Sequence, residues 1–175
     1  SWGGALAQQF AFQNPRRCRH LVLVSTSTGS LMIPGRARVL RLMTTPRRYR
    51  DPAYAVSIAA TLYGGTLRDH PELARQLFSA ERLGAPGGYL LQLLAGAGWT
   101  SLPALPFIRQ PTLVLTGRDD PIIRVVNGRM MTALLPHARL HVFDDGHLGL
   151  VTKAGELAPL VANFVQDTPA AARPV

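Results

Sequence analysis

Three short, largely apolar runs recur along the chain and have the pattern of buried strands. They occupy positions 21–24, 112–116 and 140–143. Runs of this length without strict apolar–polar alternation are typical of strands covered on both faces of a parallel sheet. The loops that follow parallel strands lie along one edge of the sheet. The pattern therefore predicts three loops that share an edge.

Helical segments are expected around these runs. One is predicted at 3–14, another at 125–135 and a last one at 157–165, with proline ending the first two. From about 31 to 106, helical stretches are interrupted by proline and glycine, and no strand alternation is evident. Helices inserted between two strands are typical of a lid or cap, although a separate helical domain fits the same pattern.

These elements indicate an α/β protein with a parallel sheet. The chain divides into a first core segment (1–30), a helical cap insertion (31–106), a second core segment (107–167) and a flexible tail (168–175). Chain ends rich in proline and alanine are commonly frayed, which explains the last boundary. The sequence thus predicts one core interrupted by a cap.

Composition supports a single globular domain of an enzyme. The 175 residues are 47% hydrophobic and 17% charged, which is below the usual proportion of about a quarter. The formal net charge is +9, and all but one of the 19 basic residues are arginine. Arginine clusters at 16–19 and 36–50 could meet an anionic surface, but they lack a recognisable nucleic-acid-binding motif, so nucleic acid is not an expected partner. No apolar run approaches the ~20 residues of a membrane span.

The cysteine content indicates in which cellular compartment the protein is expected. Cys18 is the only cysteine and cannot form an internal disulfide, and no cysteine–histidine cluster has metal-ligand spacing. These features favour the cytoplasm, and they do not suggest a bound metal.

A serine, an acid and a histidine occur in an informative order. Ser1 opens the first predicted helix, Asp120 follows the second predicted strand and His147 follows the third. This is the chain order of the α/β-hydrolase triad, whose serine lies in G-x-S-x-G at a strand-to-helix turn; Ser1-Trp2-Gly3 matches its second half. A serine hydroxyl needs an imidazole to take its proton and a carboxylate to orient that imidazole. We therefore predict Ser1 as nucleophile, His147 as base and Asp120 as acid.

Two of these residues have structural alternatives. Ser1 could simply cap the following helix, but a cap does not require the glycines at 3 and 4. Asp120 could be a turn residue before proline, and Asp119 could also be the acid. We prefer Asp120 because the hydrolase pattern has its acid immediately before this proline.

His147 competes with four other histidines, but it alone follows a strand end within Asp-Asp-Gly-His at 144–147. The glycine provides the tight turn needed to aim the ring. Asp144 and Asp145 are interpreted as solvated loop charges rather than as catalytic groups.

An oxyanion hole needs two backbone donors, and the residue after the nucleophile usually gives one of them. Here that donor is the Trp2 N–H group. The second donor would come from a loop after an early strand, upstream of Ser1. We interpret the sequence as the C-terminal part of an α/β-hydrolase whose N-terminal strands are missing, and we expect little activity from this part alone.

Several segments carry a more specific resemblance. They include SWGGALAQQF at 1–10, GWTS at 98–101, QPTLVL at 110–115 and DDGHL at 144–148. Together they resemble the intracellular depolymerases of medium-chain-length poly(3-hydroxyalkanoate), which are α/β-hydrolases. The resemblance implies that Ser1 attacks a polyester bond and that an acyl-enzyme is hydrolysed to 3-hydroxyacyl monomers or oligomers. It implies no metal or organic cofactor, and a hydrophobic polyester granule as partner.

A polyester with alkyl side chains also requires an apolar groove. Candidate contacts are Tyr63, Tyr89, Leu93, Trp99 and Leu148, although each is at least as well explained as core. Where the family is expected to carry a bulky residue after the histidine motif, this chain has glycine at 149.

Three other functions fit part of the same pattern. A general carboxylesterase or lipase for soluble medium-chain esters would use the same triad. A carbon–carbon hydrolase of small substrates is another enzymatic alternative. A granule-associated binding protein with an unused triad is the alternative without catalysis.

Overall fold

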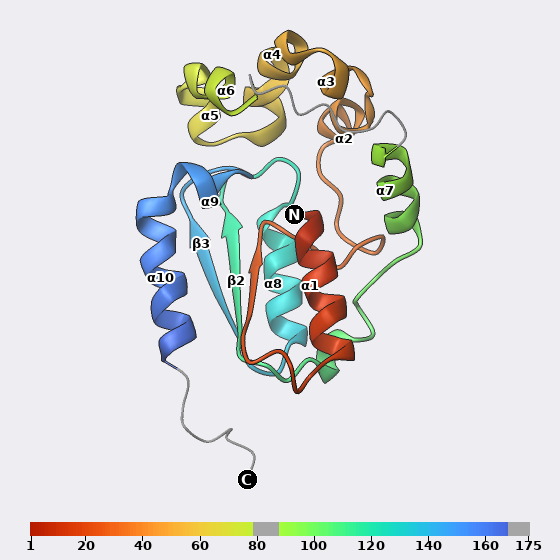
Figure 1. Ribbon diagram of the computed structural model, residues 1–175, viewed down its shortest axis with the longest axis vertical. Coiled ribbons are helices and arrows are strands. Elements are labelled where there is room, and N and C mark those ends of the chain that lie inside the picture. The colour runs from red at the N-terminus through yellow and green to blue at the C-terminus, as the bar shows by residue number, and fades with distance from the viewer. Residues whose placement is uncertain (79–87, 168–175) are drawn as a thin grey trace.

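Three parallel strands form the centre of the molecule in a computed structural model, which describes residues 1–78 and 88–167, with the side chains of Tyr89 and Leu90 left out. The strands are β1 (Leu21–Val24), β2 (Thr112–Gly117) and β3 (Ala138–Phe143), in the order β1-β2-β3 (Figure 1). All three predicted strands are confirmed. β3 begins two residues before the predicted start because Ala138 and Arg139 pair with the first residues of β2.

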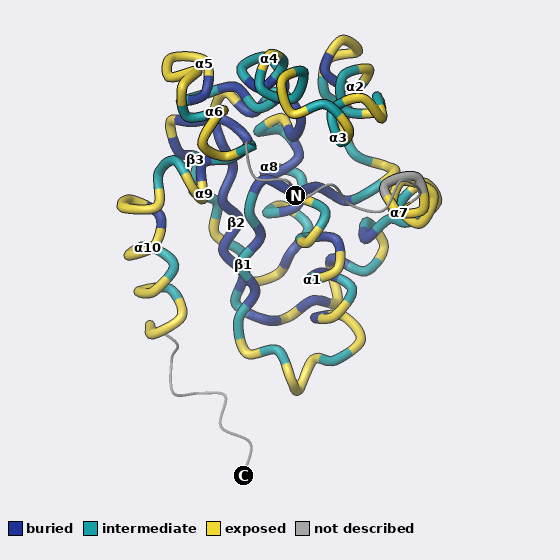
Figure 2. The backbone as a smooth tube through the Cα atoms, turned by 45° about the horizontal axis from the view of Figure 1, so that its top comes forward, coloured by how far each residue is buried: buried dark blue, intermediate teal, exposed yellow. Residues whose placement is uncertain are grey.

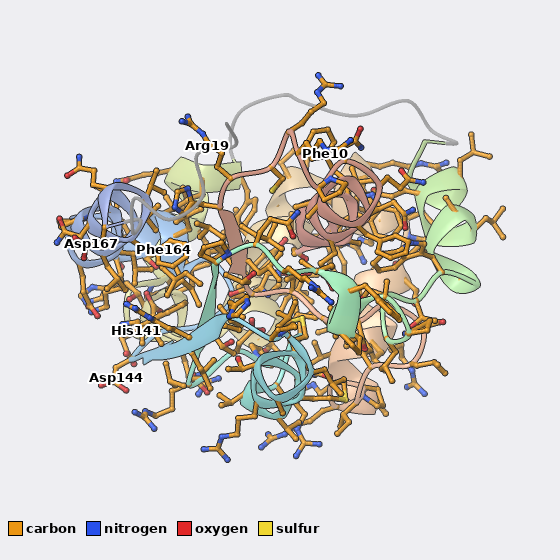
Figure 3. The ribbon with its side chains drawn as sticks, turned by 90° about the horizontal axis from the view of Figure 1, so that it is seen from below. Phe10, Arg19, His141, Asp144, Phe164 and Asp167 are labelled. Atoms are coloured by element: carbon orange, nitrogen blue, oxygen red, sulfur yellow. The ribbon has the colours of Figure 1, made fainter. Side chains whose placement is uncertain are left out.

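Helices cover both faces of this sheet (Figure 1). α1 (Trp2–Gln13) and α8 (Val125–Leu134) pack on one face, and α10 (Ala154–Gln166) packs on the other. Viewed from below, Phe10 of α1 and Phe164 of α10 lie on either side of the strands (Figure 3). All six residues of β2 are buried, which explains why its sequence shows no alternation.

A helical insertion separates β1 from β2. It comprises α2 (Ala37–Thr44), α3 (Arg47–Arg50), α4 (Pro52–Tyr63), α5 (Thr66–Asp69), α6 (Pro71–Phe78) and α7 (Gly88–Ala97), and the short helix η1 (Leu105–Phe107) follows. Helices α2 to α6 lie over the carboxyl ends of the strands, while α7 stands beside α1 (Figure 1). Val39 and Leu62 of the insertion pack against Ile122 and Ile123 of the loop after β2. The insertion is therefore seated directly on the edge where the strand loops end.

The last part of the chain differs from expectation in two places. A short helix, α9 (Gly149–Thr152), follows the histidine motif, and α10 begins at Ala154 rather than at 157. Gly149 is buried against the Phe143 ring, and a Cβ atom on it would collide with that ring. The space in which a bulky residue was expected is thus already filled by Phe143.

Two further expectations concern the ends and the membrane. The predicted tail at 168–175 lies outside the described residues. Among the helices that are described, none combines the length and apolar character required to cross a bilayer.

Candidate active site

Asp120 and His147 meet at the carboxyl edge of the sheet, in the loops after β2 and β3. The Nδ1 atom of His147 lies 2.8 Å from Oδ2 of Asp120, and their side chains are only 7% and 0% exposed. The other carboxylate oxygen, Oδ1, accepts hydrogen bonds from the backbone N–H groups of Ile122 and Ile123, each at 2.9 Å. Both oxygens of Asp120 are therefore engaged, and Nε2 is the imidazole nitrogen left for a reacting group.

Ser1 lies at the start of α1, beside the end of β1. Its amino group donates to the Val24 carbonyl at 2.8 Å, and its carbonyl accepts from Oγ1 of Thr26 at 2.7 Å. These two contacts fix the Ser1 backbone beside the end of β1.

The first turn of α1 bears on whether Ser1 is a helix cap or a nucleophile. Ser1 occupies the N-cap position, but its hydroxyl makes no capping hydrogen bond. The two following glycines also differ: a Cβ atom on Gly4 would collide with the Thr26 side chain, whereas one on Gly3 would meet nothing. Trp2 is the first residue of α1, where a backbone N–H has no acceptor within the helix. The turn therefore presents a free hydroxyl and an available N–H side by side.

The histidine loop is held against the end of α4. The His147 N–H group donates to the Tyr63 carbonyl at 2.7 Å. The rings of Tyr63 and His147 are nearly parallel, with centroids 6.2 Å apart, and Tyr63 also stacks on Phe78 at 5.3 Å. Gly146 faces the Tyr63 carbonyl so closely that a Cβ atom would not fit. The position of His147 thus depends on the insertion as well as on the sheet.

Asp145 is not the solvated charge that the sequence suggested. It is 4% exposed, and its carboxylate accepts from the Thr66 N–H at 2.6 Å, the Thr66 hydroxyl at 2.9 Å, the Gly146 N–H at 2.7 Å and the Thr152 hydroxyl at 2.5 Å. Asp144 behaves as expected: it is exposed, pairs with Arg118 at 2.5 Å and points away from the molecule (Figure 3). Two adjacent and identical residues therefore have opposite environments, which their sequence alone does not reveal.

These hydrogen bonds affect the acidity of Asp145. Burial opposes its ionisation, but the hydrogen bonds from Thr152, Thr66 and Gly146 outweigh burial and hold the pKa of Asp145 below its ordinary value.

A lowered folded-state pKa gives a testable dependence of stability on pH. The ionised Asp145 stabilises the fold above its unfolded pKa of about 4, and this contribution is lost as pH falls through the lower folded-state pKa. We expect Asp145→Asn to be less stable than the parent at pH 7 and the difference to shrink below about pH 4. Urea unfolding at pH 7, 5 and 3 measures this; a constant difference across that range would contradict it.

The five predicted substrate contacts fall into two groups. Tyr63 and Leu148 pack in one apolar cluster beside the histidine loop. Leu93 is 37% exposed on α7, and Trp99 donates from Nε1 to the Gln9 side chain at 2.9 Å. Tyr89 also belongs to α7, but its side chain lies outside the described residues. Among the described side chains, those of Tyr63 and Leu148 therefore lie beside the histidine loop.

A pocket of about 460 Å³ opens between α5 and the histidine loop. Charged side chains dominate its lining, including Asp69, Arg118 and Lys153, whereas Ser1 and His147 do not line it. Within the described ranges, no three histidine, cysteine or acidic side chains are grouped so as to hold a metal ion. This polar pocket is not suited to an alkyl chain.

Burial is concentrated around the edge that carries these residues. Ser25 to Thr28, after β1, are buried, as are Asp145 to His147 after β3 (Figure 2). Thr26, Thr66 and Thr152, which hold Ser1 and Asp145 in place, were not anticipated. Thr26 follows a strand, and Thr66 and Thr152 belong to short helices; no sequence motif distinguishes such hydroxyl residues from ordinary ones.

Comparison with known proteins supplies the family. Residues 1–154 match the family model described as alpha/beta hydrolase fold. The chain is 52% identical over 167 residues to a poly(3-hydroxyalkanoate) depolymerase of Ectopseudomonas oleovorans, with 95% of this chain and 59% of that protein covered. It is 26% identical to 3-oxoadipate enol-lactonase 2 of Acinetobacter baylyi, covering 86% of this chain and 56% of that protein.

Solved structures show the same architecture. The enol-lactonase from Burkholderia xenovorans LB400 superposes with a TM-score of 0.77 at 19% identity, covering 95% of this chain and 64% of that one. The chain spans about 60% of the length of the depolymerase and of the Acinetobacter enol-lactonase described above.

Proposed function

Because the chain belongs to the α/β-hydrolase fold family, we propose that it carries the catalytic triad of a serine hydrolase. Ser1 is the nucleophile, His147 the general base and Asp120 the acid that orients the base. The observation that carries this proposal is the buried 2.8 Å contact between His147 Nδ1 and Asp120 Oδ2. Such a pair adds little net stability, because removing both groups from water offsets their attraction, and this favours a catalytic role.

The proposed reaction proceeds in two halves. Ser1 Oγ attacks the ester carbonyl carbon while His147 Nε2 takes the hydroxyl proton, and the Trp2 N–H stabilises the negative oxygen that forms. The tetrahedral species then expels the alcohol, which receives the proton from His147 and leaves an acyl-enzyme. In the second half, His147 deprotonates a water that attacks the acyl carbonyl, and the carboxylic acid leaves as Ser1 regains its proton.

In both halves of the reaction, Asp120 acts through His147. Its Oδ2 accepts a hydrogen bond from the Nδ1–H group of His147, which keeps the proton on Nδ1 and leaves Nε2 unprotonated to act as the base. The N–H groups of Ile122 and Ile123 keep the carboxylate in this orientation. This arrangement stabilises the imidazolium that forms when the proton moves.

We propose medium-chain-length poly(3-hydroxyalkanoate) as the substrate, with 3-hydroxyacyl monomers or oligomers as products. The relative that is 52% identical is a poly(3-hydroxyalkanoate) depolymerase, and Tyr63 and Leu148 offer apolar surface beside His147. The segment 31–106 is then the cap over this site, and the protein works in the cytoplasm at polyester granules. A general esterase for soluble medium-chain esters is the alternative outcome of the test below.

The test uses the natural protein that carries this chain, with medium-chain polyester granules and a soluble octanoate ester as substrates. We expect release of 3-hydroxyoctanoate from the granules, and we expect a fluorophosphonate to label Ser1, as mapped by mass spectrometry. The Ser1→Ala variant should take up no label. Cleavage of the soluble ester without polymer hydrolysis would replace the depolymerase by the esterase, and labelling elsewhere would remove Ser1 as nucleophile.

A further inference from the structure

One backbone segment of the insertion and one of the histidine loop are joined by an unusually dense contact. Residues 63–66 of α4 and α5 meet residues 145–147 after β3, and we call this the insertion–histidine contact. In one direction the His147 N–H donates to the Tyr63 carbonyl at 2.7 Å. In the other, the N–H and hydroxyl of Thr66 donate to the Asp145 carboxylate at 2.6 and 2.9 Å. The two segments therefore hold each other through reciprocal hydrogen bonds.

Glycines bring the two backbones this close together. Gly65 has a positive φ of 51°, and a Cβ atom on it would collide with the Asp145 carboxylate and the Gly146 nitrogen. A Cβ atom on Gly146 would in turn collide with the Tyr63 carbonyl. No side chain separates the segments, so a shift of one is transmitted to the other.

Asp145 is the centre of this contact. Its carboxylate joins three segments: Thr66 of the insertion, Gly146 next to the histidine, and Thr152 of α9. Asp119 adds a weaker, more exposed anchor, since its Oδ2 accepts from the Gly65 N–H at 2.8 Å and pairs with Arg68 at 3.0 Å. Of these two carboxylates, that of Asp145 is the buried one and accepts from four donors, so it is the stronger link between the insertion and the histidine loop.

We propose that Asp145 is a positioning residue of the active site, which couples the seating of the insertion to the orientation of His147. The proposal rests on the proposed function, because it assigns His147 as the base. Oδ1 of Asp145 accepts from two backbone N–H groups and Oδ2 from two threonine hydroxyls. An amide in place of the carboxylate would remove the negative charge that strengthens all four hydrogen bonds, and both hydroxyls would have to turn from donors into acceptors. The contact would loosen, and His147 would lose its fixed orientation.

The experiment compares Asp145→Asn with Asp144→Asn in the natural protein that carries this chain. The two variants make the same change of charge one residue apart, but Asp144 is exposed and pairs with Arg118 at the surface. For a short soluble ester, we expect Asp145→Asn to lower kcat on the order of 100-fold with little change in KM, since a small misplacement of a catalytic group has an effect of this size. Asp144→Asn should stay within about twofold of the parent, as is usual for exposed pairs.

A further substitution, Thr66→Val, tests whether Asp145 acts through the insertion. It removes the threonine hydroxyl that donates to the Asp145 carboxylate from the insertion side. If Asp145 acts through the insertion, Thr66→Val should lower kcat and add little to Asp145→Asn in the double variant. Full additivity would show that Asp145 acts by another route and would overturn the proposal.

Two readouts separate a positioning role from a structural one and from failure of the proposed function. If Asp145→Asn unfolds at a lower temperature while kcat per folded molecule is unchanged, Asp145 is merely structural and the proposal is wrong. If the parent cleaves no ester, amide hydrogen exchange still tests whether Asp145 couples the insertion to the histidine loop. Asp145→Asn should accelerate exchange of both the Thr66 and His147 amides, and Asp144→Asn should accelerate neither. Acceleration at Thr66 alone would refute the coupling.

Discussion

Replacing Asp120 by asparagine is expected to lower kcat for ester hydrolysis by about 10⁴-fold with the fold intact. The reason lies in the two backbone donors on its Oδ1. The N–H groups of Ile122 and Ile123 will select the orientation in which the asparagine oxygen faces them. The NH₂ group is then directed at His147 Nδ1, which must become an acceptor. The imidazole proton moves to Nε2, and the ring can no longer take a proton from Ser1.

The matched variant is Asp119→Asn. Asp119 precedes Asp120, but its side chain is 48% exposed and pairs with Arg68, so we expect a loss of no more than about tenfold. Steady-state kinetics on a soluble octanoate ester, with circular dichroism as a check of folding, measures both variants. A larger loss for Asp119→Asn than for Asp120→Asn would transfer the role of the acid to Asp119.

The second large effect is expected from Gly65→Ala. The added Cβ atom must fit where the Asp145 carboxylate and the Gly146 nitrogen already lie, at a positive φ that disfavours alanine. Overpacking of this kind typically costs about 1–3 kcal/mol, and the positive φ of Gly65, combined with a ψ of −138°, adds about 1–3 kcal/mol for a residue with a side chain. We therefore expect a loss of about 3 kcal/mol in the free energy of unfolding together with a marked fall in kcat.

Gly155→Ala serves as the control for that variant. A Cβ atom on Gly155 in α10 meets nothing within 4 Å, and alanine favours a helix over glycine by up to about 1 kcal/mol. Urea unfolding should show Gly155→Ala to be equal to or more stable than the parent. Equal stability of Gly65→Ala and the parent would mean that the two backbones can separate without cost.

The sequence predicted the sheet well, because strands that are buried on both faces consist largely of apolar residues. The largely apolar runs of β1 and β2 follow from the helices that cover both faces of the sheet. Boundaries were less accurate: the start of β3 includes the exposed Arg139, and the start of α10 precedes Pro159 by five residues. The ends of these elements are set by contacts with neighbouring elements, and the local sequence pattern does not show those contacts.

Only the residues of the site that belong to a sequence motif could be predicted. Motif order indicated Asp120 and His147, and their hydrogen bond agrees with it. The burial of Asp145 was missed, because it depends on Thr66, which lies 79 residues away in the sequence. Likewise, Gly3 and Gly4 look equivalent in the sequence, but only Gly4 faces Thr26. Residues whose role depends on a distant partner cannot be identified from local pattern.

The close backbone approach between residues 63–66 and 145–147 also limits how this scaffold can be re-engineered. A side chain added at Gly65 or Gly146 meets backbone atoms that cannot move aside, so substitutions of these two glycines are expected to prevent folding before activity can be tested. The exposed leucines of α7 carry no such constraint. Libraries built on this scaffold should therefore keep the two glycines unchanged and diversify exposed positions such as these.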